Sequence, residues 1–248
     1  LGTCTSVGVP TIGCKCKVCT SNDPHDKRLR ASAMIETDNT RVVIDCGPDF
    51  REQMLGLEFR KIDAVLLTHI HYDHVGGLDD LRPFCQFGEV NVYSDKHTAD
   101  GLMHTMPYCF DENKYPGVPK INLNTIEPHE SLRIGDFDIM PVKVMHDKMP
   151  ILGYRIGRLL YITDMKTISE SEFSYFSGIK TLVVNALRFA PEHHSHQTVA
   201  DAIAFARRVG AEHTYFTHMG HDIGLHSETN GILPEDINLA YDGQIIEI

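Results

Sequence analysis

Four potential metal ligands lie within six residues in the segment Thr68-His-Ile-His-Tyr-Asp-His74, directly after an apolar run. Three imidazoles and one carboxylate form a set of nitrogen and oxygen donors that suits zinc, manganese or iron. Alternate side chains of a strand share one face, so we expect His69 and His71 to point the same way where the strand ends. Asp73 then opens the following turn and helix. The chain is therefore expected to carry a metal centre at the end of a buried strand.

Apolar, β-prone runs recur along the chain, and most of them end in a residue that can bind a metal. They cover Arg41–Asp45, Ala64–His69, Asp138–His146, Leu159–Asp164, Thr181–Ala186 and His213–His218. In open α/β sheets, ligands gather at the carboxyl ends of the strands. We therefore expect one cleft to collect side chains that lie far apart in the sequence.

The spacing of apolar residues predicts helices between these strands. The expected helices cover Asp49–Leu57, Asp73–Leu81 with a stop at Pro83, and Val199–Val209 with a stop at Gly210. The neighbouring runs Ile151–Ile156 and Leu159–Thr163 are typical of a hairpin. Together these patterns predict an α/β fold, a four-layer αββα sandwich of two mixed β-sheets flanked by helices.

Length, charge and hydropathy narrow the classes of function. The 248 residues suit a single domain, 1–248, whose first strand we expect to be truncated because the chain opens on Leu1 within a strand-like segment. With 34 acidic against 23 basic residues and no basic block, an extended nucleic-acid surface is disfavoured. The sequence contains no run of 18 apolar residues, so no membrane span is predicted. No secretory signal is visible, and a cytoplasmic location is expected. The sequence leaves homodimer formation open.

Three of the seven cysteines, Cys14, Cys16 and Cys19, are clustered near the start of the chain. An odd number of cysteines with this clustering argues against a disulfide framework, and three thiolates at C-x-C-x2-C spacing can wrap one tetrahedral ion. His221 is a natural fourth ligand because it follows His218 by three residues. His25 and His226 are alternatives.

The segment His69-Ile-His-Tyr-Asp-His74 resembles the signature of the metallo-β-lactamase superfamily, and the resemblance extends through most of the chain. In that superfamily the signature is completed by a His, a bridging Asp and a final His, which His146, Asp164 and His218 match in order. The resemblance implies one metal ion on His69, His71 and His146, a second on Asp73, His74 and His218, and Asp164 shared by both. Asp45 matches an early Asp-x-Gly element and is expected to orient the ligand loop.

The cysteine triplet, together with His221, resembles the PhnP-type cyclic-phosphate phosphodiesterases of that superfamily, near its tRNase Z-like branch. The resemblance implies a closed structural zinc site on Cys14, Cys16, Cys19 and His221. One departure is Cys4, where relatives carry a small residue, and we expect Cys4 to pack under the first turn.

The expected activity is hydrolysis of small or cyclic phosphate esters by two divalent ions, zinc or manganese, with a bridging hydroxide as the nucleophile. Asp73 and His196 are the predicted catalytic residues, and His196 is the expected proton donor to the leaving group. His193 and His194 are alternatives for that role. Arg82 and Arg188 are candidate phosphate contacts that we leave outside the predicted site.

Other functions are compatible with parts of the pattern. The same ions can polarise the carbonyl of a lactone, thioester or β-lactam. A tRNase Z-like ribonuclease is disfavoured because those enzymes usually insert a long RNA-gripping arm between the third metal-binding His and the bridging Asp. Here only 17 residues separate His146 from Asp164, which leaves little room for such an arm. An iron oxidoreductase is disfavoured because diiron relatives commonly carry Glu at the position of His71. A non-catalytic binding module is disfavoured because such modules ordinarily lack some of the ligands, whereas all seven are present here.

Overall fold

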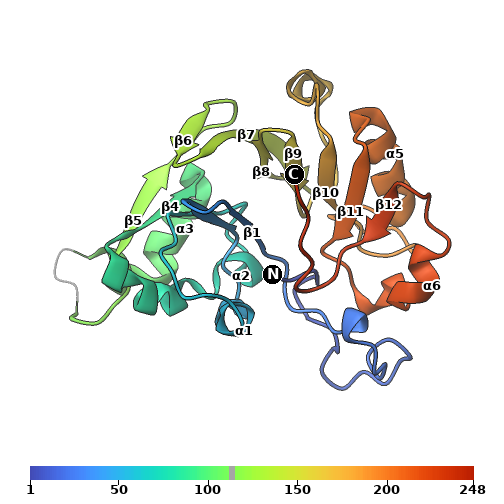
Figure 1. The fold of residues 1–248 in the computed structure, drawn as a ribbon, viewed down its shortest axis with the longest axis horizontal. Coiled ribbons are helices and arrows are strands. Elements are labelled where there is room, and N and C mark those ends of the chain that lie inside the picture. The colour runs from blue at the N-terminus through green and yellow to red at the C-terminus, as the bar shows by residue number, and fades with distance from the viewer. Residues whose placement is uncertain (112–114) are drawn as a thin grey trace.

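The computed structural model describes residues 1–111 and 115–248, and its strands form two mixed sheets (Figure 1). The first sheet has the order β1-β2-β3-β4-β5, with β1 antiparallel and the others parallel. Its strands are β1 (Ala33–Glu36), β2 (Arg41–Ile44), β3 (Ala64–Leu66), β4 (Val90–Ser94) and β5 (Ile121–Thr125).

The second sheet has the order β12-β11-β10-β9-β8-β7-β6. The strands from β9 to β12 are parallel, whereas β6, β7, β8 and β9 pair in antiparallel fashion and include the predicted hairpin. Its strands are β6 (Leu132–Ile134), β7 (Phe137–His146), β8 (Met149–Ile156), β9 (Leu159–Ile162), β10 (Thr181–Asn185), β11 (His213–Thr217) and β12 (Ile237–Leu239).

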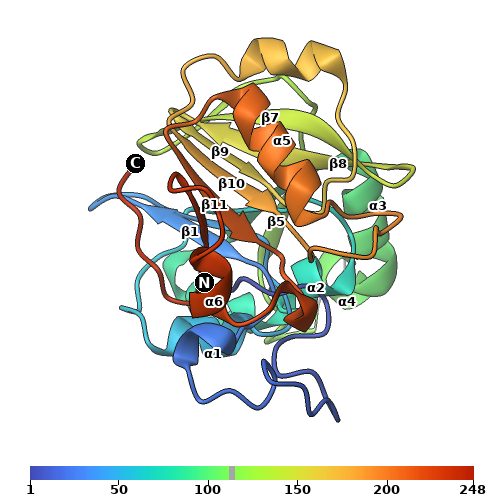
Figure 2. The same ribbon diagram turned by 90° about the vertical axis from the view of Figure 1, so that its right-hand side faces the viewer.

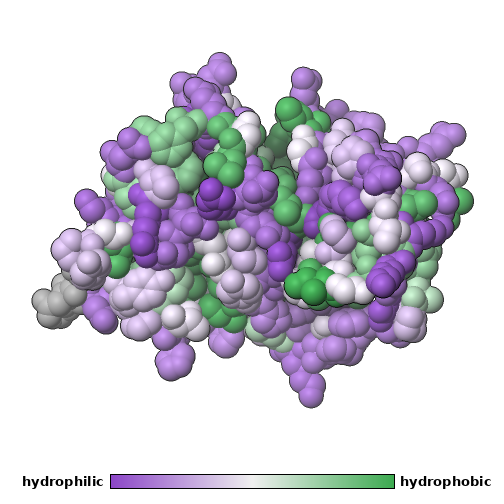
Figure 3. All heavy atoms as spheres, turned by 90° about the horizontal axis from the view of Figure 1, so that it is seen from below, coloured by the Kyte–Doolittle hydropathy of each residue, from purple (hydrophilic) through white to green (hydrophobic). Residues whose placement is uncertain are grey.

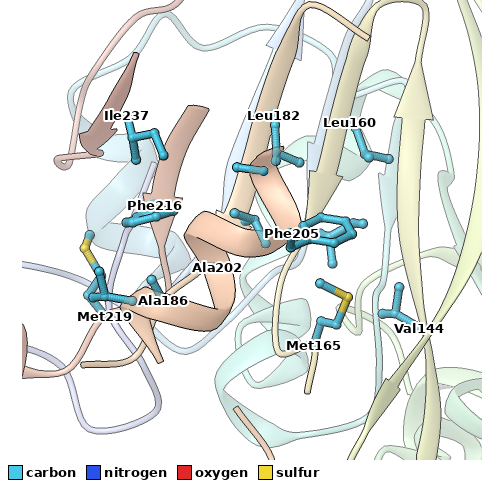
Figure 4. Packing of buried hydrophobic residues seen from close by; sticks show 14 of the residues in the cluster. Val144, Leu160, Met165, Leu182, Ala186, Ala202, Phe205, Phe216, Met219 and Ile237 are labelled. Atoms are coloured by element: carbon cyan, nitrogen blue, oxygen red, sulfur yellow. The ribbon is translucent and has the colours of Figure 1, made fainter. Parts of the chain in front are cut away.

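Three apolar cores hold the four layers together. The core between the sheets joins side chains such as Ile44 and Leu66 from the first sheet to Tyr154 and Tyr161 from the second. A second core lies under the helices that cover the first sheet, and a third lies between the second sheet and the helix α5 (Val199–Val209). Figure 2 shows α5 lying across its sheet, and Figure 4 shows their contact. The predicted αββα sandwich is confirmed.

The sequence of α5 accounts for both of its ends and for its packing. Thr198 and Asp201 form a reciprocal capping box, and Gly210 ends the helix in the left-handed conformation with φ 71°. Its buried face carries Phe205 against the second sheet. The other helices are α1 (Phe50–Leu55), α2 (Tyr72–Val75), α3 (Lys96–Thr105), α4 (Pro107–Phe110), α6 (His226–Asn230) and the 3₁₀ segments Pro24–Asp26, Leu78–Phe87, Glu170–Tyr175 and His221–Ile223.

The prediction of one helix over Asp73–Leu81 with a stop at Pro83 was wrong. The helix α2 ends at Val75, and a separate 3₁₀ segment, Leu78–Phe87, contains Pro83. The interruption falls at Gly77, whose backbone packs so closely on Gly47 that a Cβ atom would lie 2.0 Å from the Gly47 carbonyl oxygen. The glycines therefore bring two loops together beneath the metal ligands instead of continuing a helix.

The expected strand Ala64–His69 is also shorter than predicted, because β3 ends at Leu66. The backbone N–H of Thr68 donates to Asp45 Oδ1 at 2.8 Å, and the Thr68 carbonyl accepts from the N–H of Leu152 in the other sheet. Since both groups have left the β3 ladder, His69 and His71 lie on a loop and not on a strand face.

The face of the molecule seen in Figure 3 is mostly hydrophilic. The view in Figure 3 shows separate apolar patches on a hydrophilic face. Large exposed apolar side chains include Ile12, Phe59 and Ile232, which come from different parts of the chain. Among the described residues, no helix has both the length and the apolar character needed to cross a membrane.

Candidate metal centre

The predicted ligands converge from the ends of four strands in the two sheets. His69, His71, Asp73 and His74 follow β3, His146 ends β7, Asp164 follows β9 and His218 follows β11. We call these seven residues the dinuclear cluster. All are buried except His71, so the cluster opens to solvent on that side.

Three imidazoles form the first half of the dinuclear cluster. The ring atoms His69 Nε2 and His71 Nδ1 lie 3.0 Å apart, and ligand atoms of His69, His71 and His146 lie within 4.8 Å of one another. His146 Nδ1 donates to the backbone carbonyls of Asp164 at 2.8 Å and Ser195 at 3.0 Å. Because carbonyls only accept, the proton of a neutral His146 is on Nδ1 and the lone pair of Nε2 is free for a metal ion.

The second half contains Asp73, His74 and His218. Their ligand atoms also lie within 4.8 Å of one another, with His74 Nε2 and His218 Nε2 3.3 Å and 3.5 Å from Asp73 Oδ2. Both Nε2 atoms are buried, and neither has a hydrogen-bond partner within the described chain. Buried ring nitrogens without partners are costly unless a ligand satisfies them.

Asp164 lies between the two halves. One of its carboxylate oxygens, Oδ2, is 3.2 Å from His74 Nε2, while Oδ1 is 3.1 Å from His218 Nε2. Ligand atoms of Asp164, His69 and His74 also lie within 4.8 Å of one another. The Asp164 carboxylate therefore reaches imidazoles of both halves. This is the position required of a ligand shared by two cations.

The protonation states of His69, His71 and Asp164 suit divalent cations. Burial lowers the pKa of His69 and of His71, which favours the neutral imidazole that binds a metal. Burial alone would raise the pKa of Asp164, but the neighbouring His218 and His74 outweigh it and hold the pKa well below its usual value. The residues therefore fit two ions that prefer nitrogen and oxygen ligands. The buried Nε2 atoms of His74 and His218, which have no hydrogen-bond partner in the described chain, also favour this.

Asp45 supports the cluster from below. Its side chain is fully buried, with Oδ2 2.7 Å from His74 Nδ1 and Oδ1 accepting from the Thr68 backbone. The carboxylate thus fixes the ring of one ligand and the loop that carries the others. This is the location predicted for Asp45, and its orienting role stays a prediction.

The left-handed backbone of three strand-end residues has no signal in the sequence. Asp45, Asp164 and His218 have φ values of 61°, 55° and 54°. Such conformations cost a non-glycine residue of the order of 1 kcal/mol and are typical of functional sites. They turn each carboxylate or imidazole out of its strand direction toward the cluster.

His196 lies at the edge of the cluster. Its Nε2 atom is 3.1 Å from Asp164 Oδ1, and its ring stacks on that of His218 with centroids 4.9 Å apart. Burial lowers the pKa of His196 to about 4, so the imidazole is neutral at physiological pH. His193 contacts His196 through its Nδ1 atom, and His194 is exposed and tilts against His193. Of the three predicted candidates, the geometry favours His196.

The second predicted metal site is also assembled. The sulfur atoms of Cys14, Cys16 and Cys19 lie 3.2, 3.4 and 3.3 Å from Nδ1 of His221. We call these four residues the cysteine cluster. Three thiolates and one imidazole around one point suit a closed tetrahedral zinc site.

The remaining candidates lie elsewhere. His25 and His226 stack on each other with ring centroids 4.9 Å apart, away from the sulfur atoms. Cys4 is fully buried among Val9, Val18 and Cys19, so it packs under the first turn, as expected, and burial raises its pKa to about 12.

Neither candidate arginine belongs to the dinuclear cluster. Arg82 is half-exposed and pairs with Asp79 at 2.7 Å. Arg188 lies 3.6 Å from Asp222 and donates to the Pro191 carbonyl.

Comparison with known proteins agrees with this geometry. A family model described as a beta-lactamase superfamily domain matches residues 40–219. A solved structure described as a new diphosphatase from the PhnP family has 41% sequence identity and a TM-score of 0.90, covering 98% of this chain and 93% of that one. The chain belongs to the beta-lactamase superfamily and, within it, to the PhnP family.

Two further relatives qualify the comparison. An octanoyltransferase of Porphyromonas gingivalis (strain ATCC BAA-308 / W83) is 44% identical over 244 residues, which are 98% of this chain and 50% of that protein. The chain thus spans about half the length of that relative. Zinc-bound PqqB from Methylobacterium extorquens has a TM-score of 0.74 at 17% identity, with 100% and 98% coverage, and shares the fold.

Proposed function

We propose that this protein is a phosphodiesterase that hydrolyses small or cyclic phosphate esters with two divalent cations. The observation that carries the proposal is the position of Asp164 between two sets of imidazoles that include unpartnered, buried Nε2 atoms. The seven residues of the dinuclear cluster would hold the two cations, which when bound would lower the pKa of a water molecule and stabilise the charges of an in-line displacement at phosphorus.

The protein's own residues supply orientation and a hydrogen-bond donor. Asp45 and the His146 contacts hold the ligand rings in one geometry, which avoids reorganisation during the reaction. His196 faces Asp164 through Nε2, where a neutral imidazole carrying its proton on that atom can donate to the leaving oxygen of the ester.

Two observations favour a small substrate. The 17 residues between His146 and Asp164 are occupied by the turn into β8, the strands β8 and β9, and their short connections, so no arm projects there. The net charge of −11 disfavours a long polyanion. The solved PhnP-family relative is described as a diphosphatase, which also supports chemistry at phosphorus.

Acyl transfer or hydrolysis at a carbonyl is the second candidate. It is favoured by the name of the 44% identical octanoyltransferase, although about half of that protein lies outside the match. The same cations can polarise a carbonyl oxygen, so lactones, thioesters and β-lactams belong to this candidate.

A turnover panel separates the two candidates. Purified protein loaded with zinc or manganese is assayed on bis(p-nitrophenyl) phosphate, a 2′,3′-cyclic nucleotide, a lactone, an octanoyl thioester and a cephalosporin. We expect metal-dependent release of product from the two phosphodiesters. Turnover confined to the carbonyl compounds would reject the phosphodiesterase and favour the second candidate.

A further inference from the structure

Ser195 connects the predicted proton donor to a metal ligand. It is 6% exposed, and its Oγ atom lies 2.9 Å from His196 Nδ1 and 3.2 Å from His193 Nδ1. Its backbone carbonyl accepts from His146 Nδ1 at 3.0 Å. One residue therefore contacts both a ring of the dinuclear cluster and the ring beside it.

The hydrogen bonds around His196 determine its tautomer. An ionised carboxylate only accepts, so Asp164 Oδ1 at 3.1 Å requires the proton of a neutral His196 to be on Nε2. His196 Nδ1 then carries a lone pair and needs a donor.

Ser195 is that donor. The other neighbour of His196 Nδ1 is His193 Nδ1 at 3.2 Å, and His193 Nδ1 already accepts the Ser195 backbone N–H at 3.3 Å. Because His193 Nδ1 accepts this N–H, it carries a lone pair and no proton. It therefore cannot donate to His196 Nδ1. The Ser195 hydroxyl can donate, and its distance of 2.9 Å is that of an ordinary hydrogen bond.

We propose that Ser195 is a positioning residue that holds His196 in the tautomer with its proton on Nε2, aimed at the leaving oxygen. The proposal rests on the proposed phosphodiesterase function. In the overall reaction the oxygen of the attacking water forms a bond to phosphorus, and the bond between phosphorus and the leaving oxygen breaks with its electron pair on the leaving oxygen. That oxygen gains the proton lost by the water, while a neutral His196 keeps its own proton and stabilises the developing charge through the Nε2–H hydrogen bond. A wrong His196 tautomer presents a lone pair to the leaving oxygen and repels its developing charge.

The test compares two leaving groups. A nitrophenolate leaves without help, whereas the alkoxide of a 2′,3′-cyclic nucleotide is a poorer leaving group whose developing charge needs a hydrogen-bond donor. We expect Ser195→Ala to lower kcat on the cyclic nucleotide about tenfold, to lower kcat on bis(p-nitrophenyl) phosphate less than about twofold, and to leave KM on both nearly unchanged. Ser195→Thr retains the hydroxyl and restores activity. Ser174→Ala, in an exposed 3₁₀ segment, is the matched control.

A double-mutant cycle shows whether Ser195 acts through His196. His196→Ala is expected to lower kcat on the cyclic nucleotide about 100-fold or more, and the variant that combines it with Ser195→Ala should be no slower. Equal losses of kcat on both substrates, or additive losses in the double variant, would overturn the proposal. Ser195 would then support the fold or the binding of the metal ions and not the position of His196.

A measurement by nuclear magnetic resonance tests the role of Ser195 without any turnover of substrate. The ¹⁵N chemical shifts of His196 report which ring nitrogen carries the proton. The wild-type metal-loaded protein should show the proton on Nε2, and Ser195→Ala should show a mixture of tautomers. If the wild-type protein hydrolyses neither diester, the proposed function fails while this shift still decides the role of Ser195, and an unchanged tautomer in the variant would overturn it.

Discussion

The dinuclear cluster and the cysteine cluster lie three residues apart at His218 and His221, yet they are built in different ways. The dinuclear cluster gathers imidazoles and carboxylates from both sheets and opens to solvent at His71. The cysteine cluster takes three thiols from one loop and a single imidazole from a distant turn. A closed set of four ligands stabilises a fold, whereas an open set of hard and borderline ligands leaves positions for substrate.

The two clusters are also mechanically linked. Between them, Met219 pairs with Cys4, and the backbone N–H of Thr5 donates to the Met219 carbonyl at 3.1 Å. Backbone hydrogen bonds therefore hold the N-terminal segment that precedes the cysteine loop against the turn that contains His218. We infer that zinc in the cysteine cluster keeps this turn in place while taking no part in the reaction.

The largest expected effect comes from the residue shared between the two halves of the dinuclear cluster. Asp164→Ala should reduce phosphodiester turnover by a factor of roughly 1,000 or more, because both cations lose a ligand. Metal analysis should find fewer than two cations in this cluster while the cysteine cluster keeps its zinc. Asp138→Ala, a surface carboxylate paired with Arg133, is the control. Retained turnover in Asp164→Ala would show that the two clusters do not differ as described.

Removal of a thiol should affect stability more than chemistry. Cys16→Ser is expected to lower the zinc content by about one per chain and the free energy of unfolding by about 3 kcal/mol or more. The folded fraction should keep a kcat within about threefold of the wild type. Thermal unfolding followed by circular dichroism, with Cys85→Ser as the control, measures this. A large loss of kcat in fully folded Cys16→Ser would contradict the division of roles.

Asp45→Asn tests the orientation of the dinuclear ligands at a residue that is not a ligand. Loss of the charged partner of His74 should weaken cation binding about 10-fold to 100-fold. Competition with a fluorescent chelator measures the affinity, and the zinc of the cysteine cluster should be unaffected. An unchanged affinity would remove Asp45 from the dinuclear site.

The smallest predicted effect concerns His226, which packs beside the cysteine loop without binding a metal. Burial and the neighbouring Arg28 lower the pKa of His226 to about 4 in the folded protein, against about 6.5 in an unfolded chain. Between these values the unfolded chain binds more protons, so His226 lowers stability as pH falls from 6.5 toward 4.

His226→Gln should therefore flatten the decline of Tm over this pH range by roughly 2–4 °C relative to the wild type. The exposed His104→Gln serves as the control. Parallel pH profiles for the wild type and His226→Gln would show that His226 does not contribute.

The fold and the convergence of the predicted ligands could be read from the sequence because they leave periodic or clustered signals. Strands such as Thr181–Asn185 are continuous apolar runs, and the helix Val199–Val209 has a cap, an apolar stripe and a terminal glycine. The position of His146, Asp164 and His218 at strand ends predicted that they meet in one cleft, and the resemblance to the metallo-β-lactamase superfamily implied their role as ligands.

What the sequence did not reveal depends on contacts between distant segments. The end of β3 at Leu66 results from the capture of Thr68 by Asp45, and the break after Val75 results from the contact of Gly77 with Gly47. The contacts of Ser195 were equally hidden, because they join His196, its neighbour in the chain, to His146 at the end of β7. Such contacts have no periodicity and appear only in the assembled fold.

The most direct test of this account is the anomalous diffraction of a crystal grown with zinc or manganese in excess. The account predicts two strong peaks about 3.5–4 Å apart, one on each side of the Asp164 carboxylate, and a third within the cysteine cluster. A single peak at Asp164, or imidazoles of His74 and His218 turned away from the density, would contradict it.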